Sequence, residues 1–439
     1  MLINIHTIND RITHSQLTEK LVLVSILLFP ILSLSVRHWL SGIFSLLALI
    51  ALIVAIRGPH QLYKEEKVLF ALFALLLISF LVSASLNGWS DNSIRRLGTV
   101  LKYFLFFPLY LLIRQFKNLS SFLFYGIVFG GLILGLQALI DVFYSGRDQG
   151  WGIYGPIIFG DLSILFFSLT LVFLFFTSQY SRTTYLLIFS LILSALAVVL
   201  SGSRNAWLAS AFSIFAIPLL CYRFIKYRRS ILVIIPIILI AGSATLFSDT
   251  MQKRLALAYT EFKTYIYKGA PKDSPLSANS IGTRLEQWRV AIPIAMEAPL
   301  FGHGGGTAGK HVSRYAQKGL AHPDLNNPDT EKGIGGLHST YFETLVNEGI
   351  IGLVIMLSFL IYPIYIFTKA RKYDPLLSTV GIIFIANYMI FGISENPFVH
   401  DNFSSVYLIL LSVFFSEIIR NKYSAKTPST LRAEKKSLS

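Results

Sequence analysis

The sequence predicts an all-α polytopic membrane protein with about twelve transmembrane helices and a large, partly helical loop between helices 9 and 10. Three observations support this fold class. Of the 439 residues, 54% are hydrophobic and only 14% are charged, whereas soluble domains carry roughly 25% charged residues. The mean hydropathy is +0.61. Apolar runs long enough to cross the hydrocarbon layer, which takes ~20 residues, recur between Lys/Arg clusters.

The twelve predicted spans follow from these runs. They cover residues 21–36, 39–56, 68–87, 97–113, 122–145, 156–177, 185–200, 205–222, 230–247, 349–367, 378–395 and 403–419. The first twenty residues are polar, and no small-residue cleavage site follows the first apolar run, so we expect that run to stay as a signal anchor. We therefore divide the chain into spans 1–9 (1–247), a periplasmic loop with short helices (248–348), spans 10–12 (349–419) and a basic cytoplasmic tail (420–439).

The distribution of positive charge predicts the orientation. With the N-terminus inside, the cytoplasmic segments hold 21 of the 38 Lys/Arg residues, while the short outer loops hold five. Short cytoplasmic loops of membrane proteins are enriched in Lys and Arg. Both termini are therefore expected on the cytoplasmic side of the membrane. The same reasoning assigns the net charge of +15 to inner loops rather than to nucleic-acid binding.

Several basic residues lie at or below the expected outer surface, where an unpaired charge is costly. Arg204 follows Ser-Gly-Ser in a short turn between spans 7 and 8, where it is either an anion ligand or a lipid-contacting side chain. Arg95 opens span 4, and Lys102 lies about two turns further in, so it either snorkels or lines the same anionic cavity, with Asp161 as a possible partner. Arg147 is a further outward guanidinium, beside an Asp.

The long loop contains a helix that starts near residue 283. Thr283 and Glu286 have the spacing of a capping box, which places Arg284 at the first helical position. A helix N-terminus attracts anions, and a guanidinium there adds a planar fork suited to phosphate oxygens. Trp288 belongs to an apolar stripe on this helix. The alternative to an anion site is an amphipathic helix that lies on the membrane surface, with Arg284 in solvent. Pro299 and the glycines that follow it are expected to end the helix.

His338 precedes a short helix, STYFETLVNE, that meets span 10 at Gly349. The imidazole is therefore expected just above the membrane, where it can serve as a general base, although a lone loop histidine is more often a solvated bystander. His303, His311 and His322 are treated as bystanders. We expect no metal site, because the sequence contains no H-E-x-x-H or similar close ligand pair. It also lacks a P-loop, a dinucleotide motif and a nucleophile elbow.

Taken together, these motifs resemble those of bacterial O-antigen ligases, whose superfamily also contains O-antigen polymerases and protein O-oligosaccharyltransferases. The resemblance rests on the predicted topology and on the order of four motifs. These are SGSR-N with Arg204, T-R-x-x-x-W with Arg284 and Trp288, the G-x-G-G-G turn at 302–306, and L-H-S-x-Y-F-E with His338.

The resemblance implies a metal- and ATP-independent glycosyltransferase without a cofactor. It would move a glycan from undecaprenyl diphosphate to a sugar hydroxyl of lipid A–core on the periplasmic face, in lipopolysaccharide biosynthesis. Arg204 and Arg284 would bind the diphosphate and His338 would be the catalytic base. Arg95, Lys102, Arg147 and Trp288 are added as site-lining residues from their positions alone. A polymerase or a protein O-oligosaccharyltransferase remains the alternative, and a twelve-span transporter is disfavoured because the long loop divides the spans nine to three.

Overall fold

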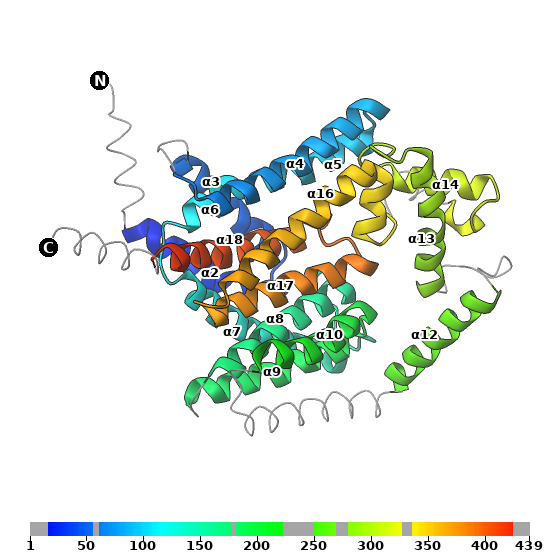
Figure 1. The fold of residues 1–439 in the computed structure, drawn as a ribbon. Coiled ribbons are helices and arrows are strands. Elements are labelled where there is room, and N and C mark those ends of the chain that lie inside the picture. Colours follow the sequence, from blue (N-terminus) through cyan, green and yellow to red (C-terminus); the bar gives the residue numbers. More distant parts are fainter. Residues whose placement is uncertain are drawn as a thin grey trace.

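The structure is a computed structural model, and it describes residues 16–55, 61–177, 181–222, 249–268, 280–326 and 336–424. Within these ranges the protein is built of helices and connecting turns alone (Figure 1). The membrane helices are α2 (Gln16–Ile31), α3 (Trp39–Ala55), α4 (Lys64–Asn87), α5 (Asp91–Phe104), α6 (Phe106–Ile113), α7 (Leu119–Leu139) with the π-turn η1 (Ile140–Tyr144), α8 (Pro156–Phe176), α9 (Arg182–Ser201), α10 (Arg204–Cys221), α16 (Thr340–Ala370), α17 (Pro375–Ser394) and α18 (Asp401–Ser424).

The helices match the predicted spans. Eleven of the twelve predicted spans coincide with these helices, and the fourth span is shared by α5 and α6. The remaining span, predicted at 230–247, lies outside the described residues. In the described part of the chain, nine helices are long and apolar enough to cross a membrane, and the apolar helix at 39–53 is somewhat shorter. The prediction of an all-α polytopic membrane protein is confirmed.

Small residues allow the helices of the first half to pack closely. A Cβ atom added at Gly126 of α7 would lie 2.5 Å from the Leu27 carbonyl of α2, and one at Gly135 would lie 2.4 Å from Cβ of Leu193 on α9. Membrane helices associate largely through such close packing, because lipid offers no hydrophobic driving force between them. Helices α8 and α18 form the buried centre, because 89% and 94% of the residues in their apolar 18-residue stretches are buried.

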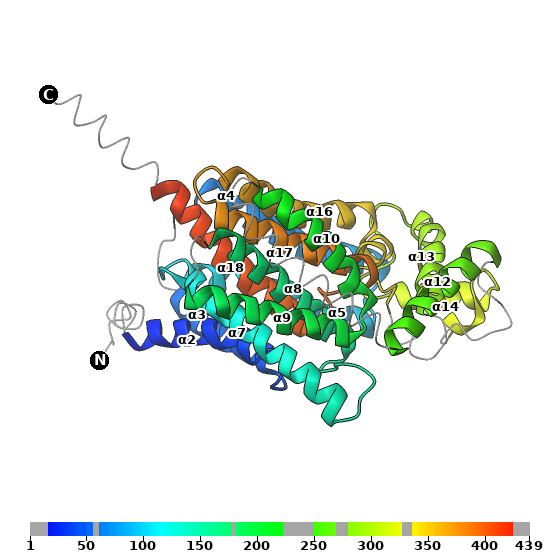
Figure 2. The same ribbon diagram turned by 90° about the horizontal axis from the view of Figure 1, so that it is seen from below.

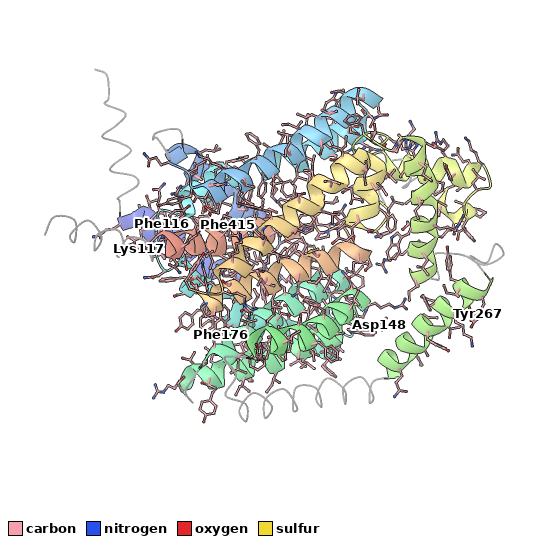
Figure 3. All side chains as sticks on the ribbon, viewed as in Figure 1. Phe116, Lys117, Asp148, Phe176, Tyr267 and Phe415 are labelled. Atoms are coloured by element: carbon pink, nitrogen blue, oxygen red, sulfur yellow. The ribbon has the colours of Figure 1, made fainter. Side chains whose placement is uncertain are left out.

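The two ends of the bundle differ. The start of α2 and the end of α18 lie together at one end, near Phe116 and Lys117 (Figures 1 and 3). The opposite end, here called the loop end, carries α12 (Asp249–Lys268), α13 (Ser280–Glu297), α14 (Ala308–Gln317) and the short 3₁₀ turn η3 (Pro323–Leu325). Figure 2 shows the same segregation from below, and Tyr267 of α12 marks this end in Figure 3. The loop helices thus gather beyond one end of the bundle.

A kink in α16 joins the loop helices to the membrane bundle. Gly349 has φ +69°, which divides α16 into a short helix at 340–348 and a long apolar helix, as the sequence predicted. The glycine turn at 302–306 packs against this kink: the amides of His303 and Gly304 donate to the carbonyls of Val346 and Asn347, at 2.9 and 3.0 Å. A Cβ at Gly349 would lie 2.3 Å from the Leu300 carbonyl, so no other residue fits there without a shift.

The start of α13 differs from the prediction. The helix includes Ser280, so Thr283 is not its N-cap and Arg284 lies more than a turn inside it. Glu286 does not complete a capping box, because its carboxylate accepts hydrogen bonds from Arg289 and from the Tyr265 hydroxyl. The helix ends at Glu297, just before Pro299, as predicted.

Candidate active site at the loop end of the bundle

A polar cavity of about 370 Å³ lies at the loop end. Its walls come from α5, from the start of α14, from the segment before α16 and from the connection between α17 and α18. The charged and titratable side chains that line it are Arg95, Arg96, His338, Glu343, Glu395 and His400. The cavity therefore combines guanidinium groups with imidazole and carboxylate groups, a composition suited to binding an anion and to transferring a proton.

Glu395 links two histidines in this cavity. Its two carboxylate oxygens lie 3.6 Å from Nδ1 of His338 and 3.5 Å from Nε2 of His400. Burial opposes ionisation of Glu395, but the contacts and charges of the two imidazoles outweigh it, and the pKa of Glu395 is held below its ordinary value. The carboxylate is therefore ionised at neutral pH and can stabilise positive charge on either imidazole.

The backbone around His338 is fixed from two sides. The Ser339 hydroxyl donates to the carbonyl of Gly392, and the Thr340 amide donates to the carbonyl of Glu395, which seats the start of α16 on the end of α17. On the other side, the Trp288 indole donates to the carbonyl of Leu337 at 3.1 Å. His338 itself has φ +45°, a backbone conformation that is unusual for a non-glycine residue. These contacts determine where the imidazole points relative to Glu395.

Two arginines enter the cavity from α5, and their surroundings differ. Arg96 forms an ion pair with Glu343 of α16. Arg95 is exposed and lines the cavity. Its side chain makes no ion pair or hydrogen bond with another residue of the described ranges. Arg95 can therefore approach an anion in the cavity without first giving up a carboxylate partner.

Arg204 and Arg284 form a second basic group near Glu395. Arg204 is the first residue of α10, and its Nη1 lies 2.8 Å from Oε2 of Glu261 on α12. Burial lowers the pKa of Arg284, and the positive charge of Arg204 adds to this effect, while the charges of Glu395 and Asp161 oppose it. Arg284 is thus within electrostatic range of Arg204, the other predicted diphosphate ligand, and of Glu395, the carboxylate that contacts His338.

Three of the four additional residues predicted to line the site do not line the cavity; they are Lys102, Arg147 and Trp288. The ammonium of Lys102 donates to the Asp401 carbonyl at 2.6 Å and to the Ser405 hydroxyl at 2.8 Å, and it is not among the residues that line the cavity. Asp161, considered as its partner, instead accepts a hydrogen bond from Asn205 at 2.9 Å. The counter-charge of Lys102 is the carboxylate of Asp401 at the start of α18, 3.6 Å from the ammonium.

Arg147 pairs with Asp141 of η1 at 3.3 Å, six residues back, rather than with the neighbouring Asp148. Trp288 does not line the cavity either, but it contacts the residue before His338. Of the four residues added from their positions in the sequence, Arg95 is therefore the one that lines the cavity in the described part of the chain. Asp148 lies at the loop end in Figure 3.

The sequence analysis missed Glu395, His400, Arg96 as a cavity residue, and Glu343. One signal was available: Glu395, the last residue of predicted span 11, and His400, in the short connection to span 12, lie five residues apart in ISENPFVHDNF. Titratable groups in so short a connection are held near the membrane surface. The orientation was predicted from Lys and Arg alone, so this carboxylate–imidazole pair was not among the candidate residues.

Comparison with known proteins supports the family suggested by the motifs. The chain is similar to an uncharacterized protein of Haemophilus influenzae (strain Rd), with 27% identity over 362 residues, covering 80% of this chain and 86% of the relative. Residues 189–357 match the O-antigen ligase family. The matched region contains Arg204, Arg284 and His338, whereas Arg95 and Glu395 lie outside it. Residues 189–357 thus carry a region that is similar to the O-antigen ligase family.

Proposed function

We propose that this protein is an O-antigen ligase that transfers a glycan from undecaprenyl diphosphate to a sugar hydroxyl of lipid A–core. The match of residues 189–357 to the O-antigen ligase family supports a glycosyltransferase-like membrane enzyme of the ligase or polymerase kind. The observation that carries the proposal is the contact of His338 with the buried carboxylate of Glu395, in a cavity with arginines on α5 and beside the Arg204–Arg284 pair.

In the proposed reaction, His338 removes the proton from the acceptor hydroxyl. The acceptor oxygen forms a bond to the anomeric carbon of the donor sugar, while the bond from that carbon to the diphosphate oxygen breaks. The proton stays on His338, and the electron pair leaves with undecaprenyl diphosphate. Glu395 stabilises the imidazolium that forms, as a carboxylate does for other catalytic histidines. Attack from the face opposite the leaving group predicts inversion at the anomeric carbon.

Arg204 and Arg284 are proposed to stabilise the negative charge that develops on the departing diphosphate. Preorganised donors aimed at such charge contribute strongly to catalysis, because they act in a site shielded from water. A lipid diphosphate is already a good leaving group, so the reaction requires neither a nucleotide nor a metal. The guanidinium groups that line the cavity are those of Arg95 and Arg96, and neither Arg204 nor Arg284 is among its lining residues.

The proposed setting is the inner membrane, with both termini cytoplasmic and the cavity on the periplasmic side. The start of α2 and the end of α18 lie at the same end of the bundle, opposite α13 and α14 (Figure 1). An arrangement with the loop end outside therefore leaves the basic connections on the inner side. Reporter fusions at residues 300 and 424 test this arrangement; a periplasmic signal from the second fusion contradicts it.

The function is tested with purified protein in detergent, supplied with undecaprenyl-diphosphate glycan and lipid A–core, without metal or nucleotide. Wild type is expected to produce glycan-capped lipid A–core on a gel, and a correctly folded His338→Ala variant is expected to produce none. Lengthening of the lipid-linked glycan by wild type would identify a polymerase instead. Equal activity of His338→Ala and wild type would exclude His338 as the base.

A further inference from the structure

A second cluster of titratable side chains lies among the loop helices, apart from the cavity. Glu297 is the last residue of α13, His303 lies in the glycine turn and His311 lies on α14. One potential ligand atom from each of the three lies within 4.8 Å of the others. None of the three lines the cavity. The fold has therefore gathered two imidazoles and a carboxylate that the proposed reaction does not use.

The hydrogen bonds of the two histidines favour a metal. Nε2 of His303 lies 2.7 Å from the carbonyl of Ile294, which can only accept, so this nitrogen carries the proton and Nδ1 keeps its lone pair. Metal-binding histidines are commonly held by such a bond from the second ring nitrogen. Nδ1 of His311 is buried and finds no hydrogen-bond partner among the described residues. Two ring nitrogens are thus available in a confined space.

The charges nearby are compatible with a cation. Glu297 supplies a negative charge, and its two oxygens contact Arg314 and the Tyr315 hydroxyl. A carboxylate offers about four lone-pair sites, so these contacts leave positions for a metal. Arg314 nevertheless competes with a cation for the same carboxylate.

We infer that Glu297, His303 and His311 bind one first-row transition-metal ion, with Zn²⁺ as the best fit to two imidazoles and one carboxylate. With water as the fourth ligand, the ion would tie the end of α13 and the glycine turn to α14. The same turn holds the kink of α16 through Val346 and Asn347. The ion is therefore a structural clamp on the loop helices rather than part of the glycan transfer.

The sequence prediction of no metal site rested on ligand spacing. His303 and His311 are eight residues apart and belong to different elements, so they do not form the close pair that a helical or hairpin zinc motif shows. The glycine turn brings them together by reversing the chain between α13 and α14. A search for short ligand motifs cannot detect a pair made in this way.

The site is tested on the full-length protein in detergent, purified with an affinity tag that contains no histidine. After treatment with EDTA and desalting, the protein is titrated with Zn²⁺ in competition with a chromophoric chelator, and Co²⁺ is added separately to record its visible spectrum. Wild type is expected to bind one equivalent. The double variant His303→Gln/His311→Gln is expected to bind at least about 100-fold more weakly, since removing even an outer-shell partner costs 10–100-fold.

Two further variants make the result specific. Arg314→Gln is expected to bind Zn²⁺ at least as tightly as wild type, because it removes the competing cation from Glu297. His38→Asn removes a histidine from a distant exposed turn, where Asn tolerates the left-handed backbone, and is expected to bind like wild type. If the double variant does not elute as folded protein, His303→Gln alone is compared. Less than one equivalent in wild type, or undiminished binding after loss of His303, overturns the assignment.

Discussion

Replacing Glu395 by Gln tests whether this carboxylate assists proton transfer. The substitution keeps the size of the side chain but removes its negative charge. In the resting enzyme, the lost contact is a carboxylate oxygen 3.6 Å from Nδ1 of His338. If His338 is the base, it becomes positively charged in the transition state. The contact with Glu395 therefore becomes stronger as the reaction proceeds, and its loss lowers kcat.

The size of the effect follows from that distance. Two full charges 3.6 Å apart attract by about 4 to 5 kcal/mol at an effective dielectric constant of ~20, which sets an upper limit. Hydrogen bonds to charged groups contribute a net ~1.5–3 kcal/mol in proteins. With each ~1.4 kcal/mol equal to a factor of ten in rate, kcat is expected to fall roughly 10- to 150-fold. The KM for the lipid-linked donor should stay equal or fall, because Arg284 loses an opposing charge nearby.

The assay is single-substrate kinetics of glycan transfer in detergent, with the donor varied at saturating lipid A–core. Glu417→Gln is the control, because Glu417 is also buried but accepts a hydrogen bond from Ser120 elsewhere in the bundle. Since the pKa of Glu395 is lowered, its charge is present above the ordinary carboxyl value of 4.5 and is lost only as the pH falls below it. The defect should therefore persist throughout the neutral range. An unchanged kcat, or a defect confined to KM, would refute the reasoning.

Three further substitutions test how the site is held. Trp288→Phe loses the hydrogen bond to the loop before His338, worth a net ~0.5–1.5 kcal/mol, so kcat should fall about 2- to 10-fold; a change in KM alone would contradict this. Gly349→Ala should destabilise the fold by at least ~2 kcal/mol, from strain and a close contact, whereas Gly98→Ala, with nothing within 4 Å, should melt like wild type. Glu261→Gln should lower the donor KM severalfold by releasing Arg204; a raised KM would show that Glu261 orients Arg204 instead.

Much of the fold could be predicted because membrane helices leave a local signal. Each span must satisfy its own backbone hydrogen bonds, so its length and apolar composition are visible in a continuous run of residues. The break at Gly349 was also visible, since a polar helix meets an apolar one there. The start of α13 could not be predicted in this way, because the Thr283–Glu286 spacing occurs within a helix as readily as at its N-cap. Glu286 instead bonds to Arg289.

The site was only partly predictable because its contacts are long-range. Basic residues at the outer ends of spans were recognised from position, and the fold brings Arg204 and Arg284 together. Their carboxylate neighbours could not be assigned, since Glu261 is 57 residues from Arg204 and Glu395 follows a different span. Pairing of this kind depends on which helices pack side by side. A single sequence contains no direct record of that choice.

The carboxylates also explain how a site with several arginines can exist before its substrate arrives. A partly buried guanidinium is costly without a counter-charge. Arg96 is paired with Glu343 and Arg204 with Glu261. The charge of Glu395 acts more strongly on Arg284 than that of Asp161 does. In the proposed reaction, the lipid diphosphate therefore exchanges with these carboxylates, whereas the Arg95 side chain has no ion-pair partner among the described residues. Such exchange keeps ground-state binding modest and leaves more of the attraction for the transition state, where the leaving diphosphate gains charge.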